Sequence, residues 1–240
     1  MSRLSLDSVT LCYPDGGGIH KVSSTFSTGE LVGVIGANGS GKSTLLKLAA
    51  GRLFPESGSV LVDGVSVSAW KARERAQRIS YLPQSVEAGL PFTVEELVDL
   101  GRGVGTATTV FGSEELFDIL GLTGLRTTPL PQLSGGERRR AFIAMVLAQG
   151  AKTILLDEPL AGLDLRYQYE LLDLLRELCH QHGLTIVVSL HELLLARGLD
   201  RVLVLHDGKV TGDGLPVEVL TDLRIRQTFD LSERFAIPSF

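Results

Sequence analysis

The distribution of apolar residues divides the chain into short continuous runs and longer segments with helical spacing. The short runs predict buried strands at residues 30–35, 153–156 and 185–189. The longer segments predict helices at residues 43–50, 70–78, 93–100, 114–120, 135–149, 165–182 and 216–220. Because strands and helices alternate along the chain, the pattern predicts an α/β fold around a sheet core.

Two Asp-Gly pairs predict β-hairpins, since this dipeptide suits the tight turn between two antiparallel strands. Asp63-Gly64 separates residues 60–62 from 65–67, and Asp207-Gly208 separates residues 203–205 from 209–210. Short strands with a glycine-rich turn are expected within residues 1–30. Residues 85–151, by contrast, have a helical pattern with no strong strand candidate.

Composition narrows the classes of function. A net charge of −5 and a pI near 5.6 argue against nucleic acid as a main partner. Cys12 and Cys179 have neither metal-ligand spacing nor a disulfide framework, which is typical of a reducing compartment. The N-terminus lacks the apolar region of a signal peptide. No apolar run approaches the roughly 20 residues that span a bilayer, so a role at a membrane requires another chain.

A glycine-rich loop between the strand at 30–35 and the helix at 43–50 carries the clearest chemistry. It consists of Gly36, Ala37, Asn38, Gly39, Ser40, Gly41, Lys42 and Ser43, and it fits the phosphate-binding pattern G-x-x-x-x-G-K-[ST]. The backbone amides of residues 39–42 are expected to surround phosphates, and Lys42 to reach the terminal oxygens. Ser43 is expected to bind Mg²⁺, and Thr44 to bind phosphate.

Two adjacent carboxylates follow the strand at 153–156. Acids at the end of a buried strand are unfavourable unless a ligand uses them. Beside a phosphate loop, Asp157 is expected to hold Mg²⁺ through water. Glu158 is then placed to orient or deprotonate a water beyond the terminal phosphate. These residues complete a candidate site for nucleotide hydrolysis.

A second candidate anion site begins at Leu133, in the run Leu-Ser-Gly-Gly-Glu. Ser134 and Glu137 have the spacing of a capping box, which predicts a helix start. Gly135 and Gly136 leave the first turn without side chains, so its N–H groups are open to a ligand. The chain therefore carries two separate half-sites for phosphate.

Taken together, these motifs resemble the ATP-binding subunits of ABC transporters over nearly the whole chain, from about residue 4 to 214. The resemblance implies a P-loop NTPase (RecA-like) core with a mixed sheet, an antiparallel β subdomain and an inserted helical subdomain. It implies one ATPase domain over residues 1–240, with 1–84 and 152–240 as catalytic core and about 85–151 as the helical subdomain.

The resemblance also assigns roles to further residues. Tyr13 matches the aromatic residue that stacks on adenine, and Gln84 matches the glutamine that senses Mg²⁺ and the attacking water. His191 matches the histidine that contacts the terminal phosphate, and Asp164 lies in the loop through which opposing subunits signal. Ser134, Gly135, Gly136 and Glu137 would contact ATP held by a second subunit, expected to be an identical one.

Details around the motifs resemble importer subunits for iron–siderophore, haem and cobalamin systems, among them residues 79–84, 93–102, 163–168 and 189–192. This implies membrane permease partners, indirectly a substrate-binding protein, and a peripheral place on the cytoplasmic face of the cell membrane. In that family the segment after Gln84 would meet the permease. The chain departs from the family pattern between 103 and 132, and again at Arg138-Arg139-Arg140, where Lys/Arg-Gln-Arg is common. A soluble ABC ATPase that scaffolds iron–sulfur assembly, and the ATPase subunit of a lipid or drug exporter, are alternatives.

Overall fold

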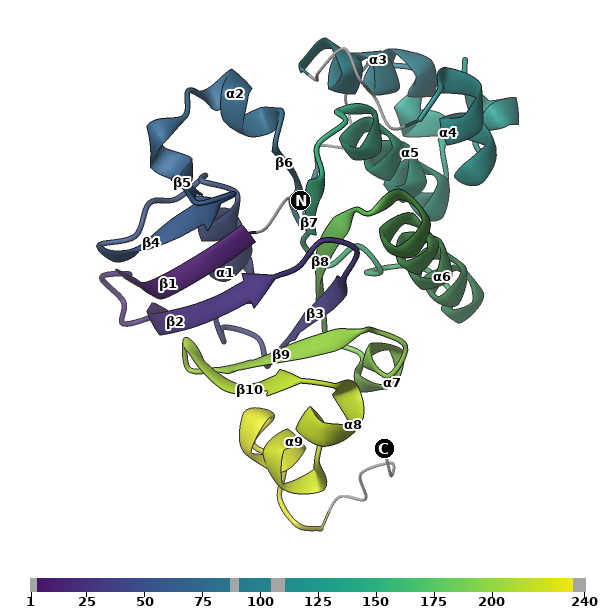
Figure 1. Cartoon of the computed structure of the whole chain (residues 1–240). Helices are drawn as coiled ribbons and strands as arrows, with labels where there is room; N and C mark the ends of the chain where they lie inside the picture. The colour runs from purple at the N-terminus through teal and green to yellow at the C-terminus, as the bar shows by residue number, and fades with distance from the viewer. Residues whose placement is uncertain (1–3, 87–90, 105–110, 235–240) are drawn as a thin grey trace.

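A six-stranded sheet lies at the centre of the computed structural model, which describes residues 4–86, 91–104 and 111–234 (Figure 1). Its strand order is β10-β9-β3-β8-β7-β6. The strands are β3 (Leu31–Ile35), β6 (Ile79–Leu82), β7 (Thr153–Leu156), β8 (Thr185–Leu190), β9 (Arg201–His206) and β10 (Lys209–Gly214). All neighbours pair in parallel except β9 and β10, so the sheet is mixed.

The continuous apolar runs arise because the central strands are buried on both faces. Leu31 and Ile35 of β3 belong to the cluster that includes the buried residues of the helices at 135–148 and 165–182. Val32 and Val34, which alternate with them, belong to the cluster shared with the second sheet. Successive side chains point to opposite faces of a strand, so each face of β3 contributes to a different core.

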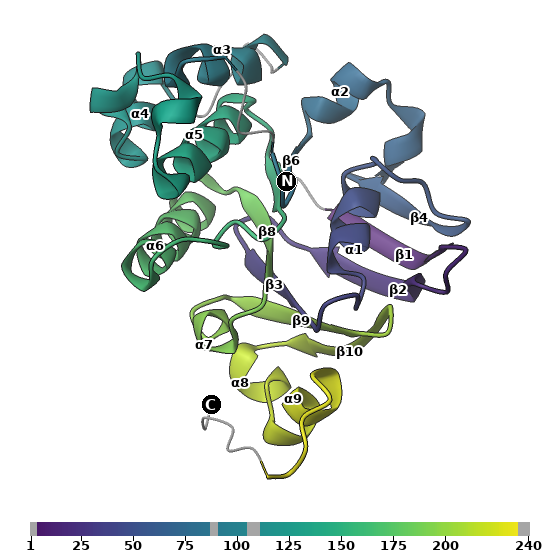
Figure 2. The same ribbon diagram turned by 180° about the vertical axis from the view of Figure 1, so that it is seen from behind.

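The second sheet, within the same described ranges, has four antiparallel strands in the order β2-β1-β4-β5. They are β1 (Leu4–Cys12), β2 (Gly18–Phe26), β4 (Ser57–Val62) and β5 (Val65–Ser66). β1 and β2 are nine residues each, longer than the short strands expected there. The helix α1 (Lys42–Ala49) lies between this sheet and the central one (Figure 2).

Both predicted hairpins are present. Asp63 and Gly64 have φ of +52° and +78°, and Asp207 and Gly208 have +46° and +70°. Two consecutive residues with positive φ fit the twist of antiparallel strands. Val67, expected at the end of the second strand, instead begins a short 3₁₀ turn at Val67–Ala69. The Ser66 hydroxyl accepts the Ser68 N–H there and starts that turn.

The helices of the 85–151 region gather at one end of the molecule, beyond β6 and β7 (Figure 1). They are α3 (Val94–Val104), α4 (Ser113–Ile119) and α5 (Gly135–Ala148). α3 and α4 both contact α5. The remaining helices are α2 (Ala72–Ala76), α6 (Leu165–His182), α7 (Leu193–Ala196), α8 (Pro216–Val219) and α9 (Asp222–Thr228). Within the described ranges, none of the helices combines the length and apolar character needed to cross a membrane.

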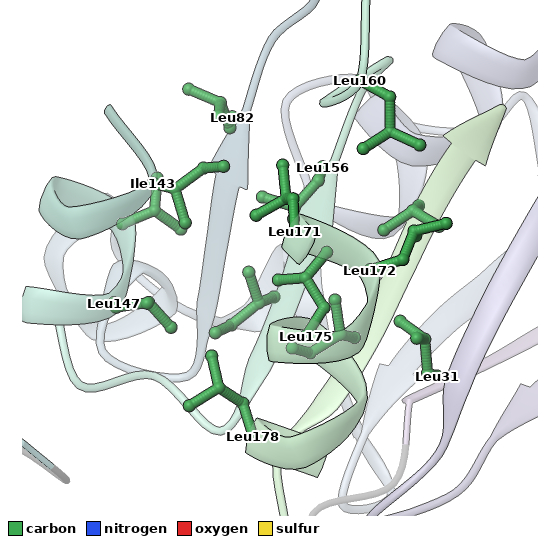
Figure 3. Close-up of a cluster of buried hydrophobic side chains, with 14 of the residues drawn as sticks. Leu31, Leu82, Ile143, Leu147, Leu156, Leu160, Leu171, Leu172, Leu175 and Leu178 are labelled. Carbon is green, nitrogen blue, oxygen red and sulfur yellow. The ribbon is translucent and has the colours of Figure 1, made fainter. Parts of the chain in front are cut away.

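A shared apolar core fixes α5 and α6 against the sheet (Figure 3). Ile143 and Leu147 come from α5, and Leu175 and Leu178 come from α6. They pack against buried strand residues that include Leu82 of β6 and Leu156 of β7. The Leu-Ser-Gly-Gly-Glu run at residues 133–137 is the signature. The helix that begins within it is therefore anchored on β6 and β7, the strands that lead to Gln84 and Asp157.

Other elements also differ from the expected pattern. The helix predicted at 70–78 is reduced to α2, because Lys71 is extended and caps a helix that begins at Ala72. Strand β6 has only four residues and follows charged residues, so no strand was predicted there. Helix α9 was also missed, although Thr221 carries an N-cap signal and its hydroxyl accepts the Arg224 N–H.

Candidate functional site

Four neighbouring strands end at one edge of the central sheet, and each is followed by a residue of the candidate site. β3 leads into the loop that starts at Gly36, and β6 leads to Gln84. β7 leads to Asp157, and β8 leads to His191. The pairings of Ile35 with Leu190 and of Leu82 with Leu156 keep these ends level. The carboxyl edge of a parallel sheet is where such folds bind ligands.

The loop at 36–43 needs its glycines for close approach and for left-handed backbone. A Cβ on Gly36 would lie 2.3 Å from the Leu205 carbonyl oxygen. Gly41 has φ +101° and forms the N-cap of α1, and a Cβ on it would lie 2.8 Å from the Gly18 oxygen. Substitution of either glycine is therefore expected to distort the loop. The open N-terminus of α1 can bind an anion.

The ammonium group of Lys42 is held inside this loop. Its Nζ donates to the carbonyl oxygens of Gly36 at 2.8 Å and of Ala37 at 3.0 Å. Burial lowers the pKa of Lys42, while the negative charges of Glu158 and Asp157 raise it. The lysine therefore provides a positive charge between the phosphate loop and the two carboxylates.

Asp157 is almost completely buried, at 1% exposure. Ser189 donates from Oγ to Asp157 Oδ1 at 2.7 Å, and Tyr81 donates from its hydroxyl to Oδ2 at 3.3 Å. Burial and the negative charge of Asp157 raise the pKa of Tyr81, so its phenol stays a neutral donor. Neither Tyr81 nor Ser189 has a predicted role, because hydrogen bonds between strands depend on the sheet order.

Gln84 and His191 converge on the carboxylate of Glu158. Gln84 donates from Nε2 to Glu158 Oε2 at 2.7 Å, and His191 Nε2 forms a short hydrogen bond with Oε1. The Glu158 side chain is 13% exposed, so it reaches the edge of the site without being fully solvated. The structure thus brings together three of the four predicted catalytic residues, with Lys42 coupled to Glu158 through charge.

The backbone of Glu158 is itself unusual, with φ +48°. A left-handed conformation at a residue other than glycine costs about 1–3 kcal/mol and persists only when surrounding contacts hold it. Its N–H donates to Ser189 Oγ at 2.8 Å. The Arg139 side chain binds the carbonyl oxygens of Asp157 and Glu158 at 2.8 and 2.7 Å. Sequence reasoning did not single out this role for Arg139.

The signature forms the capping box that its spacing predicts. Ser134 N–H donates to Glu137 Oε2 at 2.8 Å, and Glu137 N–H donates to Ser134 Oγ at 3.3 Å. The Ser134 hydroxyl and N–H lower the pKa of Glu137 by bonding its carboxylate. An added Cβ at Gly135 would meet no atom within 4 Å, so the start of α5 is open.

This helix start faces a hollow of about 590 Å³. Its lining includes residues 134–137 of the signature, residues 162–164, and Tyr167 of α6. Asp164, predicted as a signalling residue, is the N-cap residue of α6 on this wall. In the described part of the chain, no residue of the 36–43 loop lines this hollow. The two candidate phosphate sites are therefore separate surfaces of one chain.

Tyr13 lies beside the phosphate loop. Its hydroxyl is 3.4 Å from Thr44 Oγ1, and the residue is 37% exposed. An aromatic ring in this position can stack on a planar ligand whose phosphates occupy the loop.

The chain matches the family model described as "ABC transporter" at residues 19–161. It is 38% identical to the hemin import ATP-binding protein HmuV of Rhodopseudomonas palustris (strain BisB18), over 95% of this chain and 88% of the relative. It is 40% identical to the petrobactin import ATP-binding protein FpuC of Bacillus anthracis, over 85% of this chain and 78% of the relative.

The chain is also similar in fold to a solved ATP-binding cassette. The dimeric post-hydrolysis state of the ATP-binding cassette MJ0796, bound to ADP and Pi, superposes with a TM-score of 0.78 at 28% identity, covering 89% of this chain and 98% of the cassette. The family model and the relatives thus agree with the order of the motifs and with the fold. The chain therefore belongs to the ABC transporter family, as an ATP-binding and ATP-hydrolysing subunit.

Proposed function

We propose that this chain forms a head-to-tail dimer around ATP and powers import of an iron chelate, haem or cobalamin through membrane permease subunits. The observation that carries the proposal is the separation of the two half-sites. The phosphate loop has a lysine and carboxylates, whereas the signature offers open N–H groups on another surface. A second copy can bring its signature to the phosphates bound in the first.

In this proposal the chain's own loop binds most of the nucleotide. The contact residues are Tyr13 for adenine and Gly36, Asn38, Gly39, Ser40, Gly41, Lys42, Ser43 and Thr44 for the phosphates. The buried ammonium of Lys42 stabilises charge on the terminal phosphate. Glu158 orients or deprotonates the attacking water. His191 and Gln84 hold its two carboxylate oxygens, which supports their assignment as catalytic residues.

Mg²⁺ fits the available donors of this site. Ser43 and Gln84 supply uncharged oxygens, and Asp157 supplies a buried carboxylate that its hydroxyl partners hold in place. Within the described residues there is no group of three or more His, Cys, Asp or Glu side chains that could form a protein-only metal cage. Mg²⁺ often keeps waters and substrate phosphates as ligands, so a small protein set is sufficient. When bound, it neutralises charge on the phosphates.

Ser134, Gly135, Gly136 and Glu137 supply the contact to the partner's ATP. The first N–H groups of α5 can donate to a γ-phosphate, and the helix dipole favours its negative charge. The Ser134 hydroxyl, which donates to Glu137 in this structure, would turn to the phosphate when ATP is bound. Hydrolysis removes that phosphate and loosens the dimer. Asp164 lies on the same wall, which supports its proposed role in signalling between the subunits. Opening and closing then drive the permease.

The catalytic core in this proposal is residues 1–84 and 152–240, and residues 85–151 form the helical subdomain of a single 1–240 ATPase domain. The packing of α3 and α4 on α5 supports that division. Residues 87–90, in the segment after Gln84 expected to meet the permease, lie outside the described ranges. The permease would hold this peripheral chain at the cytoplasmic face of the cell membrane, with a substrate-binding protein delivering cargo.

The named functions of HmuV and FpuC support import of haem or an iron chelate over a role in iron–sulfur assembly or in export of a lipid or drug. The test is affinity purification of the chain from its own membranes, followed by ATP-driven haem uptake in vesicles. We expect a multi-span permease to co-purify and uptake to require Glu158. A stable complex with soluble partners alone would instead support an assembly scaffold, and outward movement of a lipid would support an exporter.

A further inference from the structure

The guanidinium of Arg139 binds the backbone on both sides of the hydrolytic carboxylate. Nη2 donates to the carbonyl oxygens of Asp157 and Glu158 at 2.8 and 2.7 Å, and Nε donates to that of Pro159 at 3.1 Å. Three successive peptide units therefore bind one rigid side chain. Glu158 is the middle residue, and it has the left-handed φ of +48°.

The same side chain also reaches the segment that carries Gln84. Arg139 Nη1 donates to the carbonyl oxygens of Pro83 and Gln84 at 3.5 and 3.4 Å. Gln84 in turn donates to Glu158 Oε2 at 2.7 Å. Arg139 thus contacts the backbone of both members of this hydrogen-bonded pair. The planar guanidinium has five N–H donors in fixed directions, which suits it to hold several carbonyl oxygens at once.

Arg139 is buried, with 8% of its surface exposed, although a buried cation is ordinarily paired. Among the described residues, no carboxylate oxygen lies within 4 Å of its side-chain nitrogens. Burial lowers its pKa, and the charges of Asp157 and Glu158 raise it. Its charge is therefore balanced by carbonyl dipoles and by the two carboxylates of the site. This environment is costly for a residue with only a packing role.

Arg139 belongs to α5, the helix whose N-cap is Ser134. This helix begins at the proposed contact with the partner's ATP, and Arg139 lies in its second turn. It is the middle residue of the Arg138–Arg140 run, where the sequence departs from the family pattern. One side chain therefore joins the signature helix to Glu158 and Gln84.

We infer that Arg139 is a positioning residue, which holds Glu158 in its left-handed conformation and Gln84 beside it, so that hydrolysis depends on the placement of the signature helix. The inference rests on the proposed role of Glu158 as the residue that activates water. Among the described residues, the hydrogen bonds of Arg139 go to residues 83–84 and 157–159 and not to the phosphate loop, so its loss should slow turnover and leave ATP binding intact. A misplaced catalytic group can cost on the order of a hundredfold in rate.

The test compares Arg139→Met with Arg138→Met in the purified full-length chain. Arg138 is the adjacent half-buried arginine of the same helix, and it makes none of the five carbonyl contacts. We expect Arg139→Met to lower kcat about tenfold to a hundredfold with KM for ATP within about twofold. Arg138→Met should keep both parameters within about twofold. A kcat within twofold of wild type for folded Arg139→Met would overturn the inference.

Arg139→Gln decides the matter where Arg139→Met does not fold, because glutamine leaves a polar group at this buried position but has only two N–H donors in place of the five of arginine, too few for the five carbonyl contacts. A severalfold loss of kcat at unchanged KM supports the inference, and a kcat within twofold of wild type overturns it. In a folded variant, a kcat loss that is matched by loss of ATP binding also overturns it, since this indicates a general structural role and not the positioning of Glu158.

A double-substitution cycle separates positioning from general stability. In a Glu158→Gln background, adding Arg139→Met should lower the residual single-turnover hydrolysis by no more than about threefold, because both changes act through one group. Equal losses in both backgrounds would contradict the inference. Normal turnover of Glu158→Gln itself would overturn the proposed role of Glu158, whereas loss of turnover there with a normal Arg139→Met would overturn only the role of Arg139.

Discussion

Gln84 and Glu158 are 74 residues apart in the chain, yet Nε2 of the glutamine donates to Oε2 of the glutamate at 2.7 Å. The parallel pairing of β6 with β7 produces this contact, because both residues follow the carboxyl ends of these strands. His191 binds the other carboxylate oxygen from the end of β8. The proposed water-activating group is therefore held by segments from three parts of the sequence.

Substitution of Glu158 by glutamine tests that group. The amide keeps the shape and the contact with Gln84 but cannot accept a proton, so ATP hydrolysis should fall by at least about a hundredfold. ATP binding should remain, because the phosphate loop is unchanged. Phosphate release and fluorescent-nucleotide binding measure the two properties. Turnover near the wild-type rate would remove Glu158 from its proposed role.

Substitution of Ser189 by alanine tests the support of the buried carboxylate. It removes the 2.7 Å donor to Asp157 and the acceptor of the Glu158 N–H. Loss of a partner for a buried group costs about 1–3 kcal/mol, so the free energy of unfolding should fall by that amount in urea titrations. Ser57→Ala, at an exposed position of β4, should change it by less than about 0.5 kcal/mol. Equal effects at both sites would contradict this account.

The two cysteines should differ in reactivity. Burial raises the pKa of Cys179 to about 12, because the thiolate is disfavoured in the apolar core. At pH 8 this thiol should remain protonated and unreactive in the folded protein, whereas exposed Cys12 should react. Titration with a thiol reagent should therefore count one thiol in the native state and two in denaturant. Rapid reaction of two thiols in the native protein would contradict the burial of Cys179 in the core.

The signature should act between subunits. Ser134→Arg places a bulky cation on the open start of α5, so it should block dimerisation and leave binding of ATP by the monomer intact. The background for this test is Glu158→Gln, in which bound ATP persists. We expect a dimer on a sizing column with ATP for Glu158→Gln alone, and a monomer when Ser134→Arg is added. A dimer in both cases would exclude the signature from the interface.

The features that sequence alone predicted are those with local causes. The capping box of Ser134 and Glu137, the Asp-Gly hairpins and the loop at 36–43 depend on residues a few positions apart, so spacing reveals them. The order of motifs also identified the family and hence the fold. The left-handed φ of Glu158 and its contacts with Arg139 depend on packing between distant segments. Spacing carries no signal for such contacts.

Some local expectations failed for the same reason. Strand β6 is only four residues long, and it forms because β7 pairs with it. Tyr81 and Ser189 are the polar partners of Asp157. They come from the two strands that flank β7, and only the sheet order brings them together. The charged helix predicted at 70–78 differs for a local reason: it begins only at Ala72, because Lys71 is extended.

Each ATP site is proposed to contain the phosphate loop of one chain and the signature of another. Mixing two inactive variants tests this most directly. Lys42→Ala removes the phosphate-loop cation, and Ser134→Arg blocks the signature. A head-to-tail dimer of one of each contains one site in which both half-sites are intact. We predict that the mixture hydrolyses ATP well above the sum of the two variants measured apart, whereas activity equal to that sum would contradict a site shared between subunits.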